Sequence, residues 1–261
     1  EHLLRVFEEM QPEIVIHMAA QPIVRESYAN PVYTYDVNVM GTVNVLECVR
    51  RTASVRSFVN VTTDKVYKNR EWEWGYRENE ELNGFDPYSN SKSCSELVTH
   101  SYKKSFFEDG RCAISTSRAG NVIGGGDWAK DRLVPDIVRA LHKGEEIVLR
   151  NPAAVRPWQH VLEPLGGYLL LGYLASVRYA DLSNAYNFGP NPEDTLTVEQ
   201  MTALATDIWG IGKYRVEQNL SAPHEAGLLK LDISLAKAEL GWKPAMNARE
   251  ALELTLQWYK T

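Results

Sequence analysis

Several features that would place a sequence in a specialised class are scarce or missing among these 261 residues. The three cysteines, Cys48, Cys94 and Cys112, are too few and too far apart for a disulfide framework or a zinc site. No apolar run approaches the roughly 18 residues of a membrane span. The first ten residues indicate an amphipathic helix and not a secretion signal. We therefore expect a protein of the reducing cytoplasm without a metal site.

A surplus of positive charge is also missing. The net charge is −6 and the isoelectric point is near 5.6. This balance argues against broad binding to nucleic acid or to an anionic membrane, although it is compatible with a local basic pocket. With 44% hydrophobic and 24% charged residues, the composition is that of an ordinary globular protein.

A phosphate-binding turn is the third absence. A dinucleotide-binding sheet normally opens with a strand, a glycine-rich turn of G-x-G-x-x-G spacing and a helix. Nothing before Glu13 can supply these parts, and the glycines of "GNVIGGGDW" (residues 120–128) miss the spacing. We expect the chain to begin in the middle of such an architecture, after two βαβ units of at least about 30 residues each.

Helical and strand-like periods alternate along the first half of the chain. Residues 1–10, 31–51 and 87–109 have a helical period, whereas residues 13–20, 55–63 and 111–124 form short buried runs typical of strands. This alternation predicts an α/β fold with a doubly wound, Rossmann-like parallel sheet that is incomplete at its N-terminus.

The pattern changes after residue 127, where short strands mix with further helices. We predict that residues 1–127 are the later part of a cofactor-binding domain and carry the catalytic residues. Residues 128–261 are predicted to form mainly a smaller mixed α/β lobe for the substrate, with segments such as 158–190 returning to the first domain. The cleft between the two lobes is where we expect the ligand.

The stretch "YSNSK" places Tyr88 and Lys92 four residues apart on the third predicted helix, so that both lie on one face. An ammonium group near a phenol favours the phenolate, which predicts a lowered pKa for Tyr88. A tyrosine tuned in this way can accept a proton from a sugar hydroxyl. Tyrosine–lysine pairs of this spacing also arise by chance in a chain with 13 tyrosines, so the surrounding sequence must decide whether this pair is catalytic.

The context begins with "FVNVTTDKVY" (residues 58–67), where an acid and a base follow a predicted strand. The carboxyl ends of parallel strands are where open α/β folds place their chemistry. Asp64 and Lys65 are therefore candidates for catalysis. The alternative is a solvated ion pair, which contributes little.

Taken in order, "HMAAQP", "DVNVMGT", "VTTDKVY", "YSNSK" and "SRAGNVIG" resemble the extended short-chain dehydrogenase/reductase family over essentially the whole chain. In that family, dTDP-glucose 4,6-dehydratases carry Thr-Asp-Glu where this chain has Thr63-Asp64-Lys65. Sugar-nucleotide epimerases carry a serine or threonine followed by small residues. The lysine, together with "GNVIGGGDWAKDRLVPD" and "RPWQHVLEPLGGYLLL", is similar to the branch that acts on CDP-glucose.

The resemblance implies an NAD-dependent lyase that oxidises C4 of the hexose, eliminates water across C5 and C6, and returns the hydride to C6. It implies that Tyr88, supported by Lys92, takes the O4 proton and that Thr63 bonds the C4 oxygen. Asp64 would be the acid toward the C6 hydroxyl and Lys65 the C5 base. These roles require a protonated acid and a neutral lysine, whereas their mutual attraction favours the charged forms, and the outcome stays open.

The resemblance also implies ligand contacts, each with an ordinary structural alternative. The cofactor-binding residues would be Ala19, Ala20, Gln21, Asn38, Thr62, Tyr88 and Lys92, although tight packing could explain the alanines and a satisfied core amide could explain Asn38. The substrate-binding residues would be Asn121, Arg132, Arg156, Trp158 and His224. Guanidinium groups suit a diphosphate. Trp72 and Trp74 either close over the site or pack beside it, and His17 is predicted to be structural.

The two long predicted helices match the family's four-helix interface, so a homodimer is expected. The partner is expected to be a nucleotide sugar. Two rival functions stay open. One is a different enzyme of the same scaffold, either another 4,6-dehydratase for a dTDP- or GDP-sugar or an epimerase, and Asp64 argues against an epimerase because epimerisation eliminates no hydroxyl. The other is a non-catalytic nucleotide-sugar-binding chain. The products of the resembled branch feed dideoxysugars of bacterial surface polysaccharide.

Overall fold

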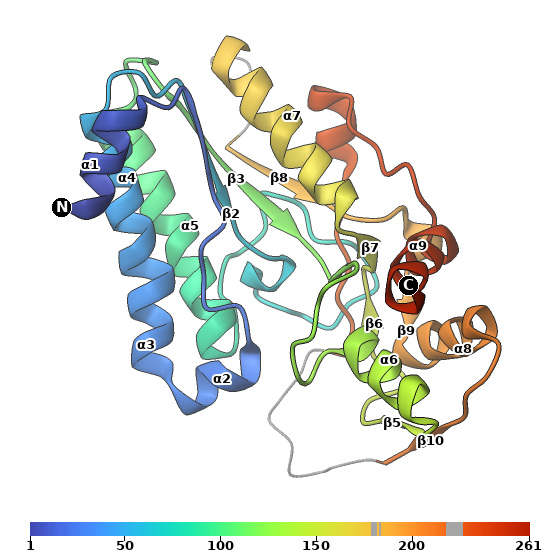
Figure 1. The fold of residues 1–261 in the computed structure, drawn as a ribbon. Coiled ribbons are helices and arrows are strands. Elements are labelled where there is room, and N and C mark those ends of the chain that lie inside the picture. The colour runs from blue at the N-terminus through green and yellow to red at the C-terminus, as the bar shows by residue number, and fades with distance from the viewer. Residues whose placement is uncertain (179–181, 183, 218–226) are drawn as a thin grey trace.

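The fold is built on a parallel sheet (Figure 1), as seen in a computed structural model that describes residues 1–178, 182, 184–217 and 227–261. The strands β1 (Ile14–His17), β2 (Ser57–Val61), β3 (Ala113–Ala119) and β8 (Ala185–Phe188) pair in the order β1-β2-β3-β8, and every pairing is parallel. All residues of β3 and β8 are buried. The predicted doubly wound α/β fold is therefore confirmed.

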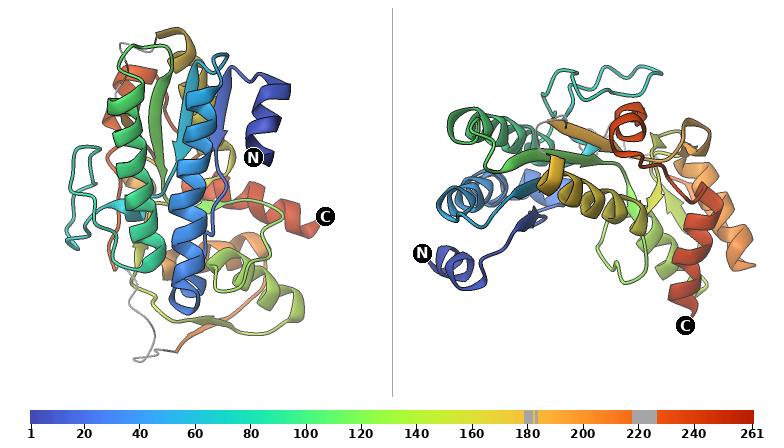
Figure 2. Two further views of the ribbon diagram at one scale, coloured as in Figure 1. Left: turned by 90° about the vertical axis from the view of Figure 1, so that its left-hand side faces the viewer. Right: turned by 90° about the horizontal axis from the view of Figure 1, so that it is seen from above.

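Helices cover both faces of this sheet (Figures 1 and 2). On one side lie α1 (His2–Met10), α4 (Gly41–Arg51) and α5 (Pro87–Phe106), and on the other lies α7 (Leu162–Arg178). The predicted helix 31–51 consists of α3 (Pro31–Tyr35), a π-helical segment (Asp36–Met40) and α4. The short helix α2 (Val24–Ala29) precedes it.

Helix α7 was not predicted, because it is apolar on nearly all sides and its period is weak. Two glycines let it approach the sheet closely. A Cβ at Gly167 would lie 2.4 Å from Cδ1 of Phe188 on β8, and one at Gly172 would lie 3.1 Å from Cγ2 of Ile14 on β1. The absence of side chains at these two positions therefore sets the distance between α7 and the sheet.

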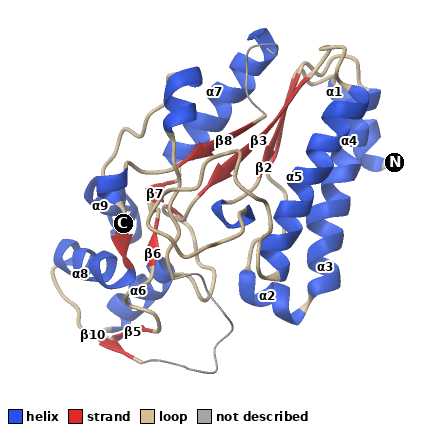
Figure 3. Ribbon diagram, turned by 180° about the vertical axis from the view of Figure 1, so that it is seen from behind, coloured by secondary structure: helices blue, strands red, loops and turns tan. Residues whose placement is uncertain are grey.

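The second lobe is smaller and mixed (Figure 3). Its helices are α6 (Leu133–Lys143), α8 (Val198–Trp209) and α9 (Ala248–Lys260), and α8 and α9 both begin with a capping box. Its strand pairs are β5 (Ile147–Leu149) with β10 (Tyr214–Val216), β4 (Val122–Ile123) with β7 (Gln159–His160), and β6 (Val155–Arg156) with β9 (Leu196–Thr197). The remaining helical turns are Asp64–Val66, Pro192–Asp194 and Ala236–Leu240.

Within the described ranges, no helix combines the length and the apolar character that a bilayer span requires. The three cysteines are free thiols.

Candidate functional site

A cleft of about 840 Å³ lies where the carboxyl ends of the main strands meet the second lobe. This is the position at which open α/β sheets bind their ligands. Thr62, Thr63 and Lys65 line it after β2, Ala119 and Asn121 line it at the end of β3, and Tyr88 lines it from the first turn of α5. Residues of α6, β5 and the 150s line the opposite side.

The triplet after β2 forms a 3₁₀ turn capped by the Thr63 hydroxyl, which accepts a hydrogen bond of 3.4 Å from the amide of Lys65. Asp64 is fully buried. Its Oδ1 accepts hydrogen bonds from Oγ1 of Thr63 (3.0 Å) and from Nζ of Lys65 (2.9 Å). Nζ of Lys65 also lies 3.5 Å from Oδ1 of Asn121. The pair thus joins a buried carboxylate to a partly exposed lysine at the edge of the cleft.

The two partners of this pair differ in their access to the cleft. Lys65 keeps 26% of its side chain exposed and lines the cleft, whereas Asp64 lies behind the lining residues. Oδ2 of Asp64 is fully enclosed and has no hydrogen-bond partner among the described residues. A buried carboxylate oxygen without a partner is costly unless a ligand, a proton or a water completes it.

Helix α5 presents the tyrosine and the lysine as predicted. Asp86 caps its N-terminus by accepting a hydrogen bond from the amide of Ser89, and Pro87 occupies the first turn. Tyr88 is 9% exposed, and Nζ of the buried Lys92 donates a hydrogen bond of 3.1 Å to the carbonyl of Val61. Lys92 therefore lies beneath the end of β2.

The predicted lowering of the tyrosine pKa is not met. Burial raises the pKa of Tyr88 to about 12, an effect that a hydrogen bond with Thr63 only partly offsets. Burial lowers the pKa of Lys92 itself to about 8, and its Nζ donates to the backbone carbonyl of Val61. The four-residue spacing predicted correctly that Tyr88 and Lys92 lie on one face of α5, but it did not predict how deeply the two side chains are buried.

A buried ion pair fixes the elements that carry these groups. Glu96, one turn after Lys92, accepts two hydrogen bonds of 2.8 Å from Arg118 on β3. It also accepts one from Thr62 (2.5 Å) and one from Thr116 (2.7 Å). Burial alone would raise the pKa of Glu96, but the charge and hydrogen bonds of Arg118 lower it below its usual range. This network ties α5 to the ends of β2 and β3.

The predicted cofactor residues divide into two groups. Thr62 and Tyr88 line the cleft, whereas Ala19, Ala20, Gln21, Asn38 and Lys92 do not. Oδ1 of Asn38 accepts a hydrogen bond from the amide of Gln21 (2.8 Å), and its Nδ2 donates to Oγ of Ser91 (2.9 Å). The side-chain amide of Asn38 thus has its hydrogen bonds satisfied within the core, as the alternative to a cofactor contact predicts.

Four of the predicted substrate residues line the same cleft, namely Asn121, Arg132, Arg156 and Trp158. Arg156 is 7% exposed and donates to the carbonyl of Val155 at 2.9 Å. Arg132 pairs with Asp127 at 3.0 Å. Nε1 of Trp158 donates to the carbonyl of Leu196 (3.2 Å), so this residue is also part of the core. His224 lies outside the described residues.

Trp72 and Trp74 do not line the cleft. The Trp72 ring packs at 5.4 Å from the Tyr76 ring and against the main core, and Trp74 is exposed. His17 is buried, and its Nε2 lies 3.3 Å from Oγ1 of Thr42, so this residue occupies the predicted structural position.

Arg25, Asp131 and Tyr168 are among the lining residues that sequence reasoning missed. Arg25 on α2 pairs with Asp131 of the second lobe at 3.3 Å, which joins the two lobes at the cleft. Tyr168 lines the cleft from α7. No local pattern marks these residues, because their roles depend on contacts between segments that are distant along the chain.

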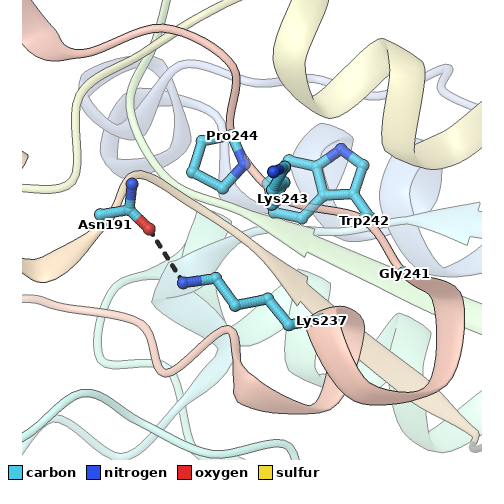
Figure 4. Close-up of a pocket in the computed structure, with 6 residues that line it drawn as sticks. All are labelled: Asn191, Lys237, Gly241, Trp242, Lys243 and Pro244. Atoms are coloured by element: carbon cyan, nitrogen blue, oxygen red, sulfur yellow. Dashed lines mark hydrogen bonds between the residues drawn. The ribbon is translucent and has the colours of Figure 1, made fainter.

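A second, smaller cavity of about 330 Å³ shares no lining residue with the cleft (Figure 4). Asn191, Lys237, Gly241, Trp242, Lys243 and Pro244 line it. Nζ of Lys237 donates to Oδ1 of Asn191 at 2.9 Å. None of these residues was predicted to take part in a site.

The residues of the cleft fit the reacting end of NAD. Thr62 and Ala119, which have short side chains, line the same cleft as Tyr88. Beneath them, Lys92 uses one of its three donors on Val61, which leaves two for a ligand. Thr62 and Tyr88 would contact this end of the cofactor, whereas Lys92 lies behind the lining residues and could reach it only from beneath the end of β2.

Comparison with known proteins places the chain among nucleotide-sugar enzymes. The sequence profile of the family described as GDP-mannose 4,6 dehydratase matches residues 1–255. A CDP-glucose 4,6-dehydratase of Salmonella typhimurium is 48% identical over 265 residues, covering 100% of this chain and 74% of the relative. A dTDP-glucose 4,6-dehydratase of Streptomyces antibioticus is 30% identical over 94% of this chain and 70% of its own length.

Solved structures agree on the fold. DesIV, a dTDP-glucose 4,6-dehydratase from Streptomyces venezuelae with NAD bound, superposes with a TM-score of 0.83 at 26% identity, over 98% of this chain and 77% of its own. A UDP-glucose 4-epimerase from Thermus thermophilus in complex with NAD superposes with a TM-score of 0.86 at 23% identity, over 99% and 81%. Because dehydratases and epimerases share this fold, the residues of the site must decide between them.

Proposed function

The chain belongs to the GDP-mannose 4,6 dehydratase family, and from that premise we propose that it dehydrates CDP-glucose to CDP-4-dehydro-6-deoxyglucose with NAD as its cofactor. The observation that carries the proposal is the buried Asp64–Lys65 pair at the edge of the cleft that Tyr88 lines. The 48% identity to a CDP-glucose 4,6-dehydratase over the whole of this chain supports the choice of nucleotide.

Each proton of the proposed reaction has a group to move it. Tyr88 takes the proton of O4 while Thr63 holds the C4 oxygen. NAD, when bound, supplies a hydride acceptor at C4 and returns the hydride to C6. Lys65 removes the C5 proton, which the 4-keto group has made acidic, and Asp64 protonates the departing C6 hydroxyl. Water leaves, Lys65 returns its proton to C5 as C6 receives the hydride, and the proton on Tyr88 passes through solvent to Asp64, so that every group regains its starting state.

The position of each group fits its task. Lys65 lines the cleft and can reach a substrate carbon, whereas Asp64 is enclosed and keeps one carboxylate oxygen, Oδ2, without a partner among the described residues. Because this oxygen is enclosed in the structure, the proposed role of Asp64 requires that substrate binding opens Oδ2 to the cleft, where it meets the departing hydroxyl.

An epimerase is the second candidate, because the epimerase fold superposes equally well. A simple epimerase inverts one carbon and eliminates nothing, so it has no use for an acid and a base beside its tyrosine. The Asp64–Lys65 pair therefore favours the dehydratase.

The nucleotide and its diphosphate are assigned to the opposite side of the cleft. We place the diphosphate against Asn121 and Arg156, because a guanidinium group suits phosphate oxygens. Arg132, which lines the same cleft, is assigned to the nucleotide pocket. Trp158, and His224 outside the described residues, are assigned to the nucleotide.

The oligomeric state and the division into domains belong to the same proposal. We propose a homodimer formed through the outer faces of α3, α4 and α5, which lie side by side (Figure 2). Exposed apolar side chains support it: Val32 (82% exposed), Tyr33 and Leu97 on these helices, and Met40 on the π-helical segment between α3 and α4. We propose that residues 1–127, joined by parts of 158–190, form the domain that holds NAD. We also propose that the enzyme works in the cytoplasm, because its cysteines are free thiols and free thiols persist in that compartment.

Mass spectrometry of parallel reactions tests this function. The purified protein is incubated with NAD and either CDP-glucose or dTDP-glucose. We expect the loss of one water from CDP-glucose and little change in dTDP-glucose, with Asp64→Asn and Lys65→Ala each abolishing the mass shift. Intact CDP-glucose in the presence of bound NAD would contradict the proposal. If both substrates lose water, the dehydratase chemistry stands but the preference for CDP as the nucleotide is wrong.

A further inference from the structure

Tyr168 is a buried polar residue that the proposed mechanism does not use. It lies on α7, is 4% exposed, belongs to the main hydrophobic core, and packs edge-to-face with Phe188, at 5.6 Å between ring centroids. It also lines the cleft. Its ring is therefore held in place by the core, whereas its end faces the ligand space.

The hydroxyl of Tyr168 has no hydrogen-bond partner among the described residues. It is nevertheless not a fully enclosed atom, in contrast to Oδ2 of Asp64. The small exposed part of this side chain therefore includes the hydroxyl, and it opens into the cleft that the residue lines. Buried tyrosine hydroxyls usually find a partner, so an unpartnered one that opens into a binding cleft points to a ligand atom.

The neighbours of this hydroxyl indicate which part of the ligand it meets. Burial raises the pKa of Tyr168, and the nearby Tyr88 and Asp64 raise it further. Tyr168 thus lies within electrostatic reach of both groups and stays protonated at neutral pH. It is a hydrogen-bond donor and not a base.

We propose that the Tyr168 hydroxyl donates a hydrogen bond to the C6 oxygen of the substrate, the oxygen that leaves as water. This assignment rests on the proposed function, in which Asp64 serves the same oxygen. Asp64 lies behind the surface of the cleft, whereas Tyr168 reaches it. Negative charge grows on O6 as the C6–O bond breaks, and a fixed donor at that oxygen stabilises the transition state.

The proton balance is unchanged by this contact. Lys65 takes the C5 proton, the electron pair of that bond forms the C5–C6 double bond, and the C6–O bond breaks. Asp64 gives the proton that completes the water molecule. Tyr168 keeps its own proton throughout and acts by positioning and by stabilising charge.

Equilibrium binding in a Tyr88→Phe background tests the contact directly, because that background blocks C4 oxidation and hence turnover. Isothermal titration of the NAD-loaded protein is carried out with CDP-glucose and with CDP-6-deoxyglucose, which lacks O6. We expect Tyr168→Phe to weaken CDP-glucose binding about five- to tenfold, and to leave CDP-6-deoxyglucose binding unchanged. An equal loss for both ligands, or no loss for either, would overturn the contact.

Turnover gives a second readout in the protein with Tyr88 intact. Tyr168→Phe should lower kcat for water loss by about tenfold or more, while C4 oxidation of CDP-6-deoxyglucose, followed by NADH absorbance, keeps its rate. Tyr173→Phe on the exposed side of the same helix is the matched control and should change neither. If CDP-glucose binds but the Tyr168→Phe enzyme eliminates water normally, only this inference fails. If CDP-glucose does not bind at all, the proposed function fails with it.

Discussion

At the scale of single residues, burial rather than spacing governs the chemistry of Tyr88. The phenol has a pKa raised to about 12 and needs help to release its proton. Lys92 lies one helical turn away and has two donors left for a ligand. We infer that the bound substrate and cofactor, and not the lysine alone, complete the activation of the tyrosine.

Replacement of Tyr88 by phenylalanine removes only the hydroxyl. Because this group moves the O4 proton, kcat should fall by about 100- to 10,000-fold, while the affinity for CDP-glucose falls little. Initial rates of water loss measure the effect. Tyr102→Phe, on the same helix, is the control, and a Tyr88→Phe enzyme with near-normal rates would refute the assigned role.

His17 predicts a pH dependence of stability. Burial, and secondarily the charge of Lys92, lowers the pKa of His17 to about 4 from an ordinary value of 6.5. Between these values the unfolded chain binds a proton that the folded chain does not, so stability is lost as the pH falls from about 6.5 to 4. The loss from this residue should be about 3 kcal/mol.

Urea unfolding at pH 7 and pH 4.5 measures this loss. His17→Gln removes the titrating ring and should reduce the difference between the two pH values. His100→Gln, at an exposed position, should leave the difference unchanged. An equal pH response in all three proteins would contradict the assignment.

At the scale of elements, the Glu96–Arg118 pair joins α5 to β2 and β3. Glu96→Gln leaves the Arg118 charge buried without its counter-ion, so the free energy of unfolding should fall by about 3–5 kcal/mol. Chemical denaturation measures the change. Glu253→Gln breaks an exposed pair with Arg249 and should cost less than about 1 kcal/mol. Equal effects of the two substitutions would show that the buried pair is not special.

The elements with a clear period were predicted from the sequence, and the others were not. Strands β1, β2 and β3 are short runs rich in β-branched and small residues, and α5 has an acidic cap, a proline and a long polar and apolar period. Helix α7 has glycines in its interior and is apolar on nearly every side. Such a segment becomes a helix through its contacts with the sheet, which a local pattern does not contain.

At the scale of the whole molecule, the site could be predicted only in part. Thr63, Tyr88 and Asn121 follow recognisable strand ends or helix starts, and the topology brings these points together. The Arg25–Asp131 contact and the position of Tyr168 depend on how the second lobe and α7 pack. The sequence also did not reveal that Asp64 is fully buried whereas Lys65 is partly exposed.

The proposed dimer predicts a change in mass with a single substitution. Leu97 is 57% exposed on α5, and a glutamate there would place a charge in the proposed interface. Light scattering should give the dimer mass for the unaltered protein and the monomer mass for Leu97→Glu. Ile211→Glu, at another exposed apolar position, should remain dimeric. A monomeric unaltered protein would refute the dimer.

The fate of the C4 hydrogen shows whether the hydride removed from C4 returns to C6 of the same sugar, as the proposed dehydratase mechanism requires. CDP-glucose deuterated at C4 is incubated with the protein and NAD, and the product is examined by mass spectrometry and NMR. The account predicts a product that has lost one water and carries the deuterium at C6, because the hydride removed from C4 returns to C6. A product that retains its water, or that has lost the deuterium to solvent, would contradict the dehydratase mechanism.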